Sequence, residues 1–333
     1  MRRGDSFDKY SLNLVTQSHD GVHLFNFILI MKFIKKGLIY SLDKKNWWMD
    51  NSTLTPTPFL LNDQTIRIYC AIRDVKGSAR IGYVDVDAQN PSKILKVSDE
   101  PVLDIGEDGM FDDNGVILGD VIRDGDEVRM YYVGFQLVNK VKFLAYSGLA
   151  ISSDNGETFQ RFSKTPIMDR ADNALFIRAI HGTTKAKDHW RIWYSASSKW
   201  EEIDGQVFPF YNVRYAESKD GIHFSDNVGS LCLDNSGDEY RIGRARFIKI
   251  KNEDFLFYTY GTKDKINHAG VAKSHDGKNW KREKNFYFDR SENDFDSKDL
   301  GYPAPLIYKN KIYIFYTGNG CGVSGFGYAE AEL

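Results

Sequence analysis

The sequence predicts an all-β fold, a five-bladed β-propeller, because one aromatic strand pattern recurs along the chain at a nearly constant interval. Five short apolar segments share this pattern, and their central aromatic positions are Tyr69, Tyr131, Trp193, Phe257 and Phe315. These positions are 62, 62, 64 and 58 residues apart. A period near 60 residues that is sustained over most of a chain indicates one β unit repeated around an axis.

Each repeat is predicted to be a four-stranded antiparallel blade. An apolar segment precedes the aromatic strand and a strand of small residues follows it, with polar turns between them, as tight hairpins require. The third strand is followed by Asp-Asn-Gly or Asp-Gly turns at residues 153–156, 218–221 and 274–277. These dipeptides supply the positive φ of a hairpin turn. We therefore interpret their aspartates as turn residues and not as catalytic ones.

The two ends of the chain are predicted to meet in the last blade. The fifth repeat ends at Leu333, directly after its third strand, so its outer strand is missing. We expect residues 33–41 to supply that strand and to cover an otherwise open sheet edge. Residues 31–333 then form a single domain. Two interpretations of residues 1–30 stay open: an N-terminal extension, disordered or not native to the protein, and an added functional element. The five inner strands are expected to begin near Pro56, Gly115, Asn173, Arg244 and Tyr302.

Composition excludes several classes of partner. The 44 basic and 46 acidic residues give a net charge of -2, so no global electrostatic attraction to nucleic acid or an anionic membrane is expected. The apolar run at residues 25–30 is too short to span a bilayer. Three cysteines cannot form a disulfide framework, which favours a cytoplasmic location. No zinc-ligand spacing and no phosphate-binding glycine loop is present, so neither a metal nor a cofactor is predicted.

Polar and aromatic residues cluster where the predicted inner strands begin and where the second strands end. In a propeller these strand ends converge on one axial funnel. Carboxylates, arginines and amides can bridge neighbouring hydroxyl groups, and an aromatic ring can stack on the C–H face of a sugar, so a carbohydrate ligand is predicted. The candidate residues are Arg73, Asp74, Asp112, Asp113, Asn114, Arg178, Trp200, Glu201, Arg244, Asp299, Tyr302 and Asn319.

Several of these residues belong to motifs that resemble a known group of proteins. The motifs are Arg73-Asp74 with residues 78–87, then residues 111–116, 211–221 and 318–327. Together they look like the five-bladed propeller glycosidases related to glycoside hydrolase families 43, 32, 68 and 130. The likeness covers residues 31–333 and is greatest to family-43-like proteins found among bacterial surface-polysaccharide genes.

This resemblance implies cleavage of a glycosidic bond by carboxylates around the funnel. Two such groups stand roughly 6.5–9.5 Å apart in inverting enzymes and roughly 5–5.5 Å apart in retaining ones. By likeness, Asp113, Asp74 and Asp299 are the catalytic candidates, and the other funnel residues bind substrate. The chain departs from the pattern, because residues 52–58 carry no Asp and residues 173–181 carry no Glu. The acid would then come from a loop, as Glu201, Glu202 or Asp299.

The sequence thus predicts a cytoplasmic glycoside hydrolase of polysaccharide metabolism. One alternative is a glycoside phosphorylase, in which arginine forks hold phosphate in place of water. Another is a non-catalytic sugar-binding or scaffold propeller. His181 is interpreted as a hydrogen-bonded core residue in preference to a ligand of water or calcium. The arginines named for phosphate are Arg73, Arg178, Arg244 and Arg246.

Overall fold

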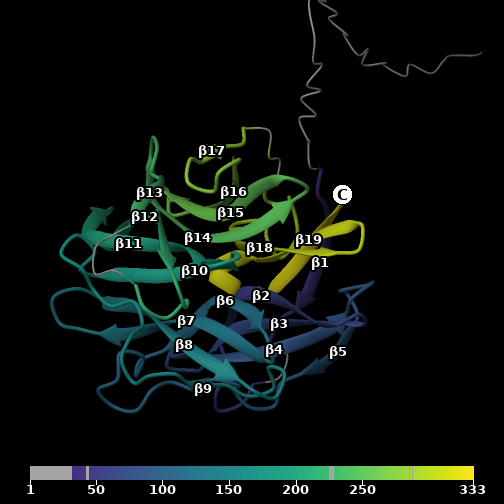
Figure 1. The fold of residues 1–333 in the computed structure, drawn as a ribbon, viewed down its shortest axis with the longest axis horizontal. Helices are drawn as coiled ribbons and strands as arrows, with labels where there is room; N and C mark the ends of the chain where they lie inside the picture. Colours follow the sequence, from purple (N-terminus) through teal and green to yellow (C-terminus); the bar gives the residue numbers. More distant parts are fainter. Residues whose placement is uncertain (1–31, 43–44, 225–228, 285, 287) are drawn as a thin grey trace, which may run out of the picture. The chain divides into compact units, whose positions relative to one another are not determined.

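The computed structural model describes residues 32–42, 45–224, 229–284, 286 and 288–333. This part of the chain forms two separate four-stranded antiparallel sheets and one twelve-stranded sheet, in which three more four-stranded blades are joined by short parallel pairings. The resulting five blades confirm the predicted propeller (Figure 1). Blade 1 consists of β2 (Ser52–Asn62), β3 (Thr65–Arg73), β4 (Ala79–Asp87) and β5 (Ile94–Val97). Blade 2 consists of β6 (Val116–Asp124), β7 (Glu127–Leu137), β8 (Phe143–Ser152) and β9 (Gln160–Arg161).

The remaining three blades repeat this order. Blade 3 consists of β10 (Ile177–Lys185), β11 (Trp190–Ile203), β12 (Gln206–Ser218) and β13 (Ser230–Leu233). Blade 4 consists of β14 (Glu239–Ile250), β15 (Glu253–Thr262), β16 (Asn267–Ser274) and β17 (Lys281–Arg282). Blade 5 consists of β18 (Gly301–Tyr308), β19 (Lys311–Thr317), β20 (Phe326–Glu332) and β1 (Ile34–Tyr40), with the short α1 (Asn319–Gly322) between β19 and β20.

The inner strands follow one another around the axis. Each of β2, β6, β10, β14 and β18 contacts the inner strand of the next blade, and β18 contacts β2. In Figure 1 these five strands surround the middle of the view, and the outer strands β5, β9, β13, β17 and β1 lie toward its edge. All five inner strands begin within five residues of the predicted positions.

The predicted pairing of the N-terminal strand with the last blade is observed. β1 pairs antiparallel with β20, with Leu38 opposite Gly327 and Tyr40 opposite Phe326. Phe33 continues the contact beyond the strand, because its ring packs edge-on against Phe257 of blade 4 at 6.2 Å. The two ends of the described chain therefore complete one blade. The predictions made for residues 1–30 lie outside the described residues.

The aromatic residues of the second strands form the core between blades. Tyr69, Tyr131, Trp193, Phe257 and Phe315 are fully buried. Trp193, for example, stacks at 4.6 Å on Phe247, which belongs to the next blade. Aromatic pairs of this kind stabilise by about 0.5–1.5 kcal/mol beyond the area they bury. The repeated aromatic pattern is thus the packing signal of adjacent blades.

The Asp-Gly turns also have the structural role that the sequence predicts. The carboxylate of Asp154 accepts hydrogen bonds from the backbone N–H groups of Glu157 and Thr158 and from the hydroxyl groups of Ser152 and Thr158. Partial burial opposes ionisation of this carboxyl, but the bonds from Ser152 and Thr158 outweigh it and lower the pKa of Asp154 to about 2. Asp220 and Asp276 hold equivalent turns in blades 3 and 4.

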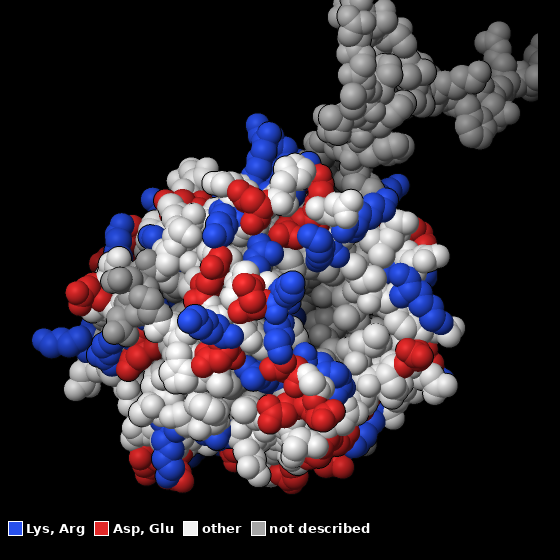
Figure 2. All heavy atoms as spheres, in the orientation of Figure 1, with Lys and Arg blue, Asp and Glu red and all other residues white. Residues whose placement is uncertain are grey.

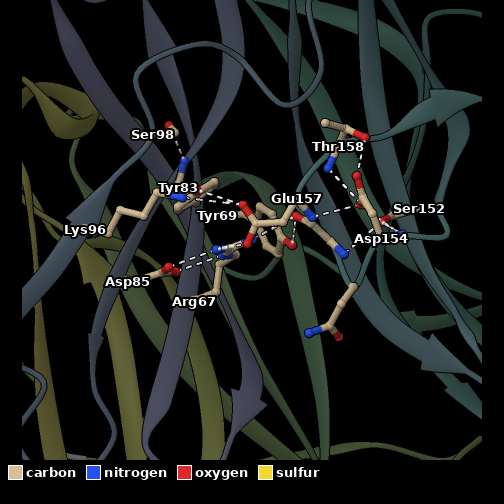
Figure 3. A network of polar contacts seen from close by, with 12 residues as sticks. Arg67, Tyr69, Tyr83, Asp85, Lys96, Ser98, Ser152, Asp154, Glu157 and Thr158 are labelled. Carbon is tan, nitrogen blue, oxygen red and sulfur yellow. Dashed lines mark hydrogen bonds and ion pairs between the residues drawn. The ribbon is translucent and has the colours of Figure 1, made fainter.

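These turns connect neighbouring blades through the second strands. Arg67 of β3 donates to the Gly156 carbonyl of blade 2 at 3.0 Å and pairs with Glu157 at 2.6 Å. The same guanidinium donates two hydrogen bonds to Asp85 of β4 (Figure 3). Tyr69 donates to the same Gly156 carbonyl at 2.7 Å. Tyr131 makes the corresponding bond one blade later. Polar contacts between second strand and turn thus reinforce the aromatic packing.

Charge is mixed over the face of the molecule drawn in Figure 2, where basic and acidic side chains alternate. This distribution agrees with the small net charge of -2. Among the described residues, no helix has the length and apolar character needed to cross a membrane.

Candidate ligand-binding site

Every inner strand contains a β-bulge close to its beginning. The pairing register shifts between Leu54 and Thr57 in β2, and the same irregularity recurs in β6, β10, β14 and β18. A bulge adds one unpaired residue and re-aims the side chains beside it. Three of the bulges, in β10, β14 and β18, place His181, Arg244 and Tyr302 in the lining of one pocket.

Three of these bulges hold a non-glycine residue in the left-handed region. Thr55, Arg244 and Tyr302 have φ values of 56°, 54° and 58°. Such a conformation costs of order 1–3 kcal/mol for a residue with a side chain, and it is concentrated at binding and active sites. Cys321, in the turn after β19, has a φ of 52° and faces the same region.

Arg244, Tyr302 and Cys321 line a pocket of about 410 Å³ at the end of the propeller where the inner strands begin, here called the axial pocket. Its volume lies within the roughly 300–1,000 Å³ typical of small-molecule sites. All five inner strands contribute to it, through Leu54, Ile117, His181, Arg244 and Tyr302, among others. The predicted axial funnel is therefore present as a pocket.

One side of the axial pocket is apolar and aromatic. Trp200 lies on the long β11–β12 hairpin and packs edge-on against Phe143 at 5.2 Å and Phe176 at 6.2 Å. Phe135, Phe208 and the aliphatic residues beside them extend this wall. The indole Nε1 of Trp200 has no hydrogen-bond partner among the described residues, so it remains available as a donor.

The pocket lining also contains four basic residues. Arg73 lies at the end of β3, Arg241 and Arg244 lie on β14, and Lys142 lies just before β8, with its Nζ 5.4 Å from the centre of the Phe208 ring. None of these four side chains forms an ion pair with a described residue. Arg241 donates to the Asn267 side chain at 2.7 Å, and Arg244 donates to the Leu118 carbonyl. Within the described residues, no Asp or Glu lines the pocket.

The histidine and the two tyrosines of the pocket are uncharged at neutral pH. Burial, together with the charges of Arg244 and Arg246, lowers the pKa of His181 well below its usual value. The neighbouring Cys321 and burial raise the pKa of the Tyr302 phenol, and burial raises the pKa of Tyr211. The axial pocket is thus lined by cations and neutral hydrogen-bonding groups.

The structure brings five of the twelve predicted site residues together. Arg73, Asn114, Trp200, Arg244 and Tyr302 all line the axial pocket.

The three residues that the resemblance implied as catalytic lie elsewhere. Asp74 pairs with Arg80 at 2.7 Å and caps the turn after β3. Asp113 accepts the Gly109 N–H at 2.9 Å, in the loop before β6. Asp299 accepts the Asn267 N–H at 3.0 Å and approaches the thiol of Cys321, so it lies behind a pocket residue.

The other four residues of the predicted set have partners within the protein. Asp112 is fully buried and pairs with Arg161 at 2.8 Å. Arg178 donates to the Asp169 carbonyl at 2.9 Å, and Glu201 pairs with Lys199. Asn319 accepts the backbone N–H groups of Lys298 and Asp299. Their roles as substrate-binding residues stay predictions.

The pocket residues that were not singled out from the sequence for this site include Lys142, Tyr211 and Arg241. Arg241 lies two residues after the observed start of β14, whereas the sequence analysis expected this strand to begin near Arg244. Tyr211 belongs to residues 211–221, one of the motifs on which the family resemblance rests. This was the feature of the sequence that could have identified it as a site residue. Lys142 gave none, because it lies in an ordinary hairpin turn. His181, interpreted as a core residue, is buried and also faces the pocket.

Comparison with known proteins identifies relatives of this chain. No known family profile matches the sequence. The chain is 30% identical over 306 residues to "Uncharacterized protein Rv1502" of Mycobacterium tuberculosis, and the match covers 91% of this chain and 100% of that protein. Among solved structures, one described as "Glycoside hydrolase" has a TM-score of 0.68 at 18% identity, over 90% of this chain and 91% of the other protein.

A second structure with the same fold is described as "The GH130 family of mannoside phosphorylases contains glycoside hydrolases that target beta-1,2 mannosidic linkages in Candida mannan". Its TM-score is 0.66 at 15% identity, over 90% of this chain and 93% of the other protein. Glycoside hydrolases and this chain therefore share the propeller fold.

Proposed function

Because this chain belongs to the same protein family as Rv1502 of Mycobacterium tuberculosis, we propose one function for the family, a carbohydrate-active propeller that takes its sugar in the axial pocket. The observation that carries the proposal is that Trp200 and several polar donors line the same pocket of about 410 Å³. A sugar has an apolar C–H face and a rim of hydroxyl groups. It fits a site with an aromatic ring on one side and charged or amide groups on the other.

The chemistry at the sugar follows from which groups face it. Hydrolysis by a carboxylate pair, the reaction implied by the family-43 likeness, needs two acids at the scissile bond. No Asp or Glu of the described chain lines the pocket, whereas Arg73 and Arg244 do. The lining therefore lacks the two acids of hydrolysis, while its arginines match the phosphate that a phosphorolysis would use. Turnover of a panel of aryl glycosides with and without phosphate distinguishes the two reactions, since only a phosphorylase requires phosphate.

The proposal extends to the cell compartment and the pathway. Cys70, Cys232 and Cys321 are free thiols in the structure, and unpaired cysteines suit a reducing cytoplasm. A role in polysaccharide metabolism rests on the resemblance of the motifs. Fractionation of cells that produce the protein tests the proposed cytoplasmic location.

Replacement of Trp200 by leucine tests the aromatic wall. Trp200→Leu removes the ring on which the sugar would stack, while an apolar side chain still packs against Phe143. A stacking contact contributes about 0.5–1.5 kcal/mol, so the dissociation constant for a sugar should rise roughly 2- to 13-fold. Isothermal titration with the sugars identified in the panel measures this change.

The matched control is Trp47→Leu. Trp47 is 56% exposed and is not among the residues of the axial pocket. Sugar affinity should therefore be unchanged in this variant. Equal affinities for the wild type and Trp200→Leu would contradict sugar binding at the aromatic wall.

A further inference from the structure

We propose that the axial pocket contains a seat for an oxyanion at Arg244, so that its ligand is an acidic sugar or a sugar bound together with inorganic phosphate. This inference rests on the proposed function and specifies the chemical class of the ligand. An acidic sugar and inorganic phosphate present the same chemistry, because both have negatively charged oxygens that accept hydrogen bonds from a guanidinium group.

Arg244 is buried and forms no ion pair with any residue of the described chain. Its side chain lines the pocket although the residue is only 5% exposed. Nη1 donates to the Leu118 carbonyl, but Nε and Nη2 have no hydrogen-bond partner among the described residues. A buried guanidinium with two unused donors is unfavourable in the free protein. An oxyanion in the pocket would satisfy both the charge and the donors.

Arg246 lies on the same strand and is also buried, but its charge partner belongs to the protein. Arg246 pairs with Asp120 at 2.7 Å and donates to the Gly119 carbonyl at 2.7 Å. The paired state is the common one among the buried arginines of the described chain. Buried or half-buried arginines with an acidic partner include Arg67, Arg80, Arg129, Arg161, Arg191 and Arg282.

The surroundings of Arg244 disfavour its charge. Burial and the nearby charge of Arg246 lower the pKa of Arg244 to about 9. A bound anion would reverse this effect, because an opposite charge within hydrogen-bond distance stabilises the guanidinium. The backbone of Arg244 is strained, with a φ of 54°. Because strain of this kind is concentrated at binding and active sites, it agrees with a role of Arg244 in binding.

Other pocket groups can complete the seat. The Arg244 guanidinium lies 5.5 Å from the centre of the Tyr302 ring, and Arg241 of the same strand and Arg73 of β3 add positive charge to the pocket. Ser195 also lines the pocket, and its hydroxyl has no partner among the described residues. Arginine forks match the geometry of phosphate and carboxylate, so the basic residues of the pocket suit either group.

The experiment measures binding of matched probes by isothermal titration. Glucose, galactose and mannose are each tested as the neutral sugar, the 1-phosphate and the uronic acid, next to inorganic phosphate. At least one anionic probe should bind ten or more times more tightly than its neutral counterpart. Arg244→Met should weaken that probe by roughly 10- to 100-fold, since hydrogen bonds to charged groups are among the strongest in proteins.

Two variants accompany Arg244→Met. Arg244→Lys keeps a positive charge but loses the planar fork, so its affinity should be intermediate. Arg123→Met removes an exposed arginine that donates to Asn155 and should leave affinity unchanged. The melting temperature of unliganded Arg244→Met should equal or exceed that of the wild type, because an unpaired buried charge is removed. A lower melting temperature with unchanged anion affinity would assign Arg244 a structural role.

The outcomes separate the two proposals. Tight binding of sugar phosphates or uronic acids places the anion on the sugar, and tight binding of inorganic phosphate with a neutral sugar places it beside the sugar. If neutral sugars bind as tightly as anionic ones and Arg244→Met has no effect, the oxyanion seat is wrong while the proposed function stands. If inorganic phosphate alone binds and no sugar does, the seat stands and the proposed function is wrong.

Discussion

Removal of residues 1–41 is expected to abolish folding of the propeller. The deletion takes away β1 and leaves β20 as an open edge, where unpaired backbone groups promote aggregation. It also removes Phe33, which packs on Phe257, and leaves the fully buried Asp296 without Lys35. Loss of one buried Phe typically costs about 3–5 kcal/mol, a large part of the roughly 5–15 kcal/mol that stabilises a domain. Soluble yield and the circular dichroism melting curve measure the effect.

The shorter deletion of residues 1–30 is the control for this experiment. It keeps β1 and every contact described for blade 5, so the melting temperature should match that of the full chain. A cooperative melting transition within a few degrees of the wild type after removal of residues 1–41 would show that β1 does not close the ring.

Replacement of Arg67 by methionine is expected to destabilise the protein by about 3–5 kcal/mol, because it leaves a buried carboxylate without its partner. Arg67 is 1% exposed and binds Asp85 through two hydrogen bonds of 2.8 Å. The same guanidinium holds Glu157 and the Gly156 carbonyl of the next blade, so the loss also loosens the contact between blades (Figure 3). Chemical denaturation gives the change in the free energy of unfolding.

A double variant separates the charge effect from the packing effect. Arg67→Met with Asp85→Leu removes both buried charges and fills the space with apolar atoms, which is often nearly neutral for a buried pair. The double variant should therefore be more stable than Arg67→Met alone. If the two are equally destabilised, the contacts of Arg67 with blade 2 outweigh its pairing with Asp85.

Most of the fold could be predicted because its signals are local and repeated. The aromatic of each second strand and the Asp-Gly turn after the third strand of blades 2, 3 and 4 recur every 60 residues or so, and each has the same structural role wherever it occurs. The closing strand followed from a count of strands, since the last repeat lacked one. Asp154 and its equivalents could be recognised as turn residues for the same reason.

The site was predicted less completely, since its geometry depends on features that leave little trace in sequence. A bulge shifts every following side chain to the opposite face, so the orientations of Arg244 and Tyr302 follow from register shifts that no pattern announces. The positions of the predicted carboxylates depend on partners that are distant in the sequence. Asp112 pairs with Arg161, 49 residues away, and this partner could not be chosen from sequence spacing.

A crystal structure of the protein with the tightest-binding sugar phosphate or uronic acid tests the central claim most directly. The sugar should lie in the axial pocket against Trp200, with an anionic oxygen about 2.7–3.2 Å from Nε or Nη2 of Arg244. A ligand bound on the outer surface of the blades, or an axial pocket without ligand at saturating concentration, would contradict the account.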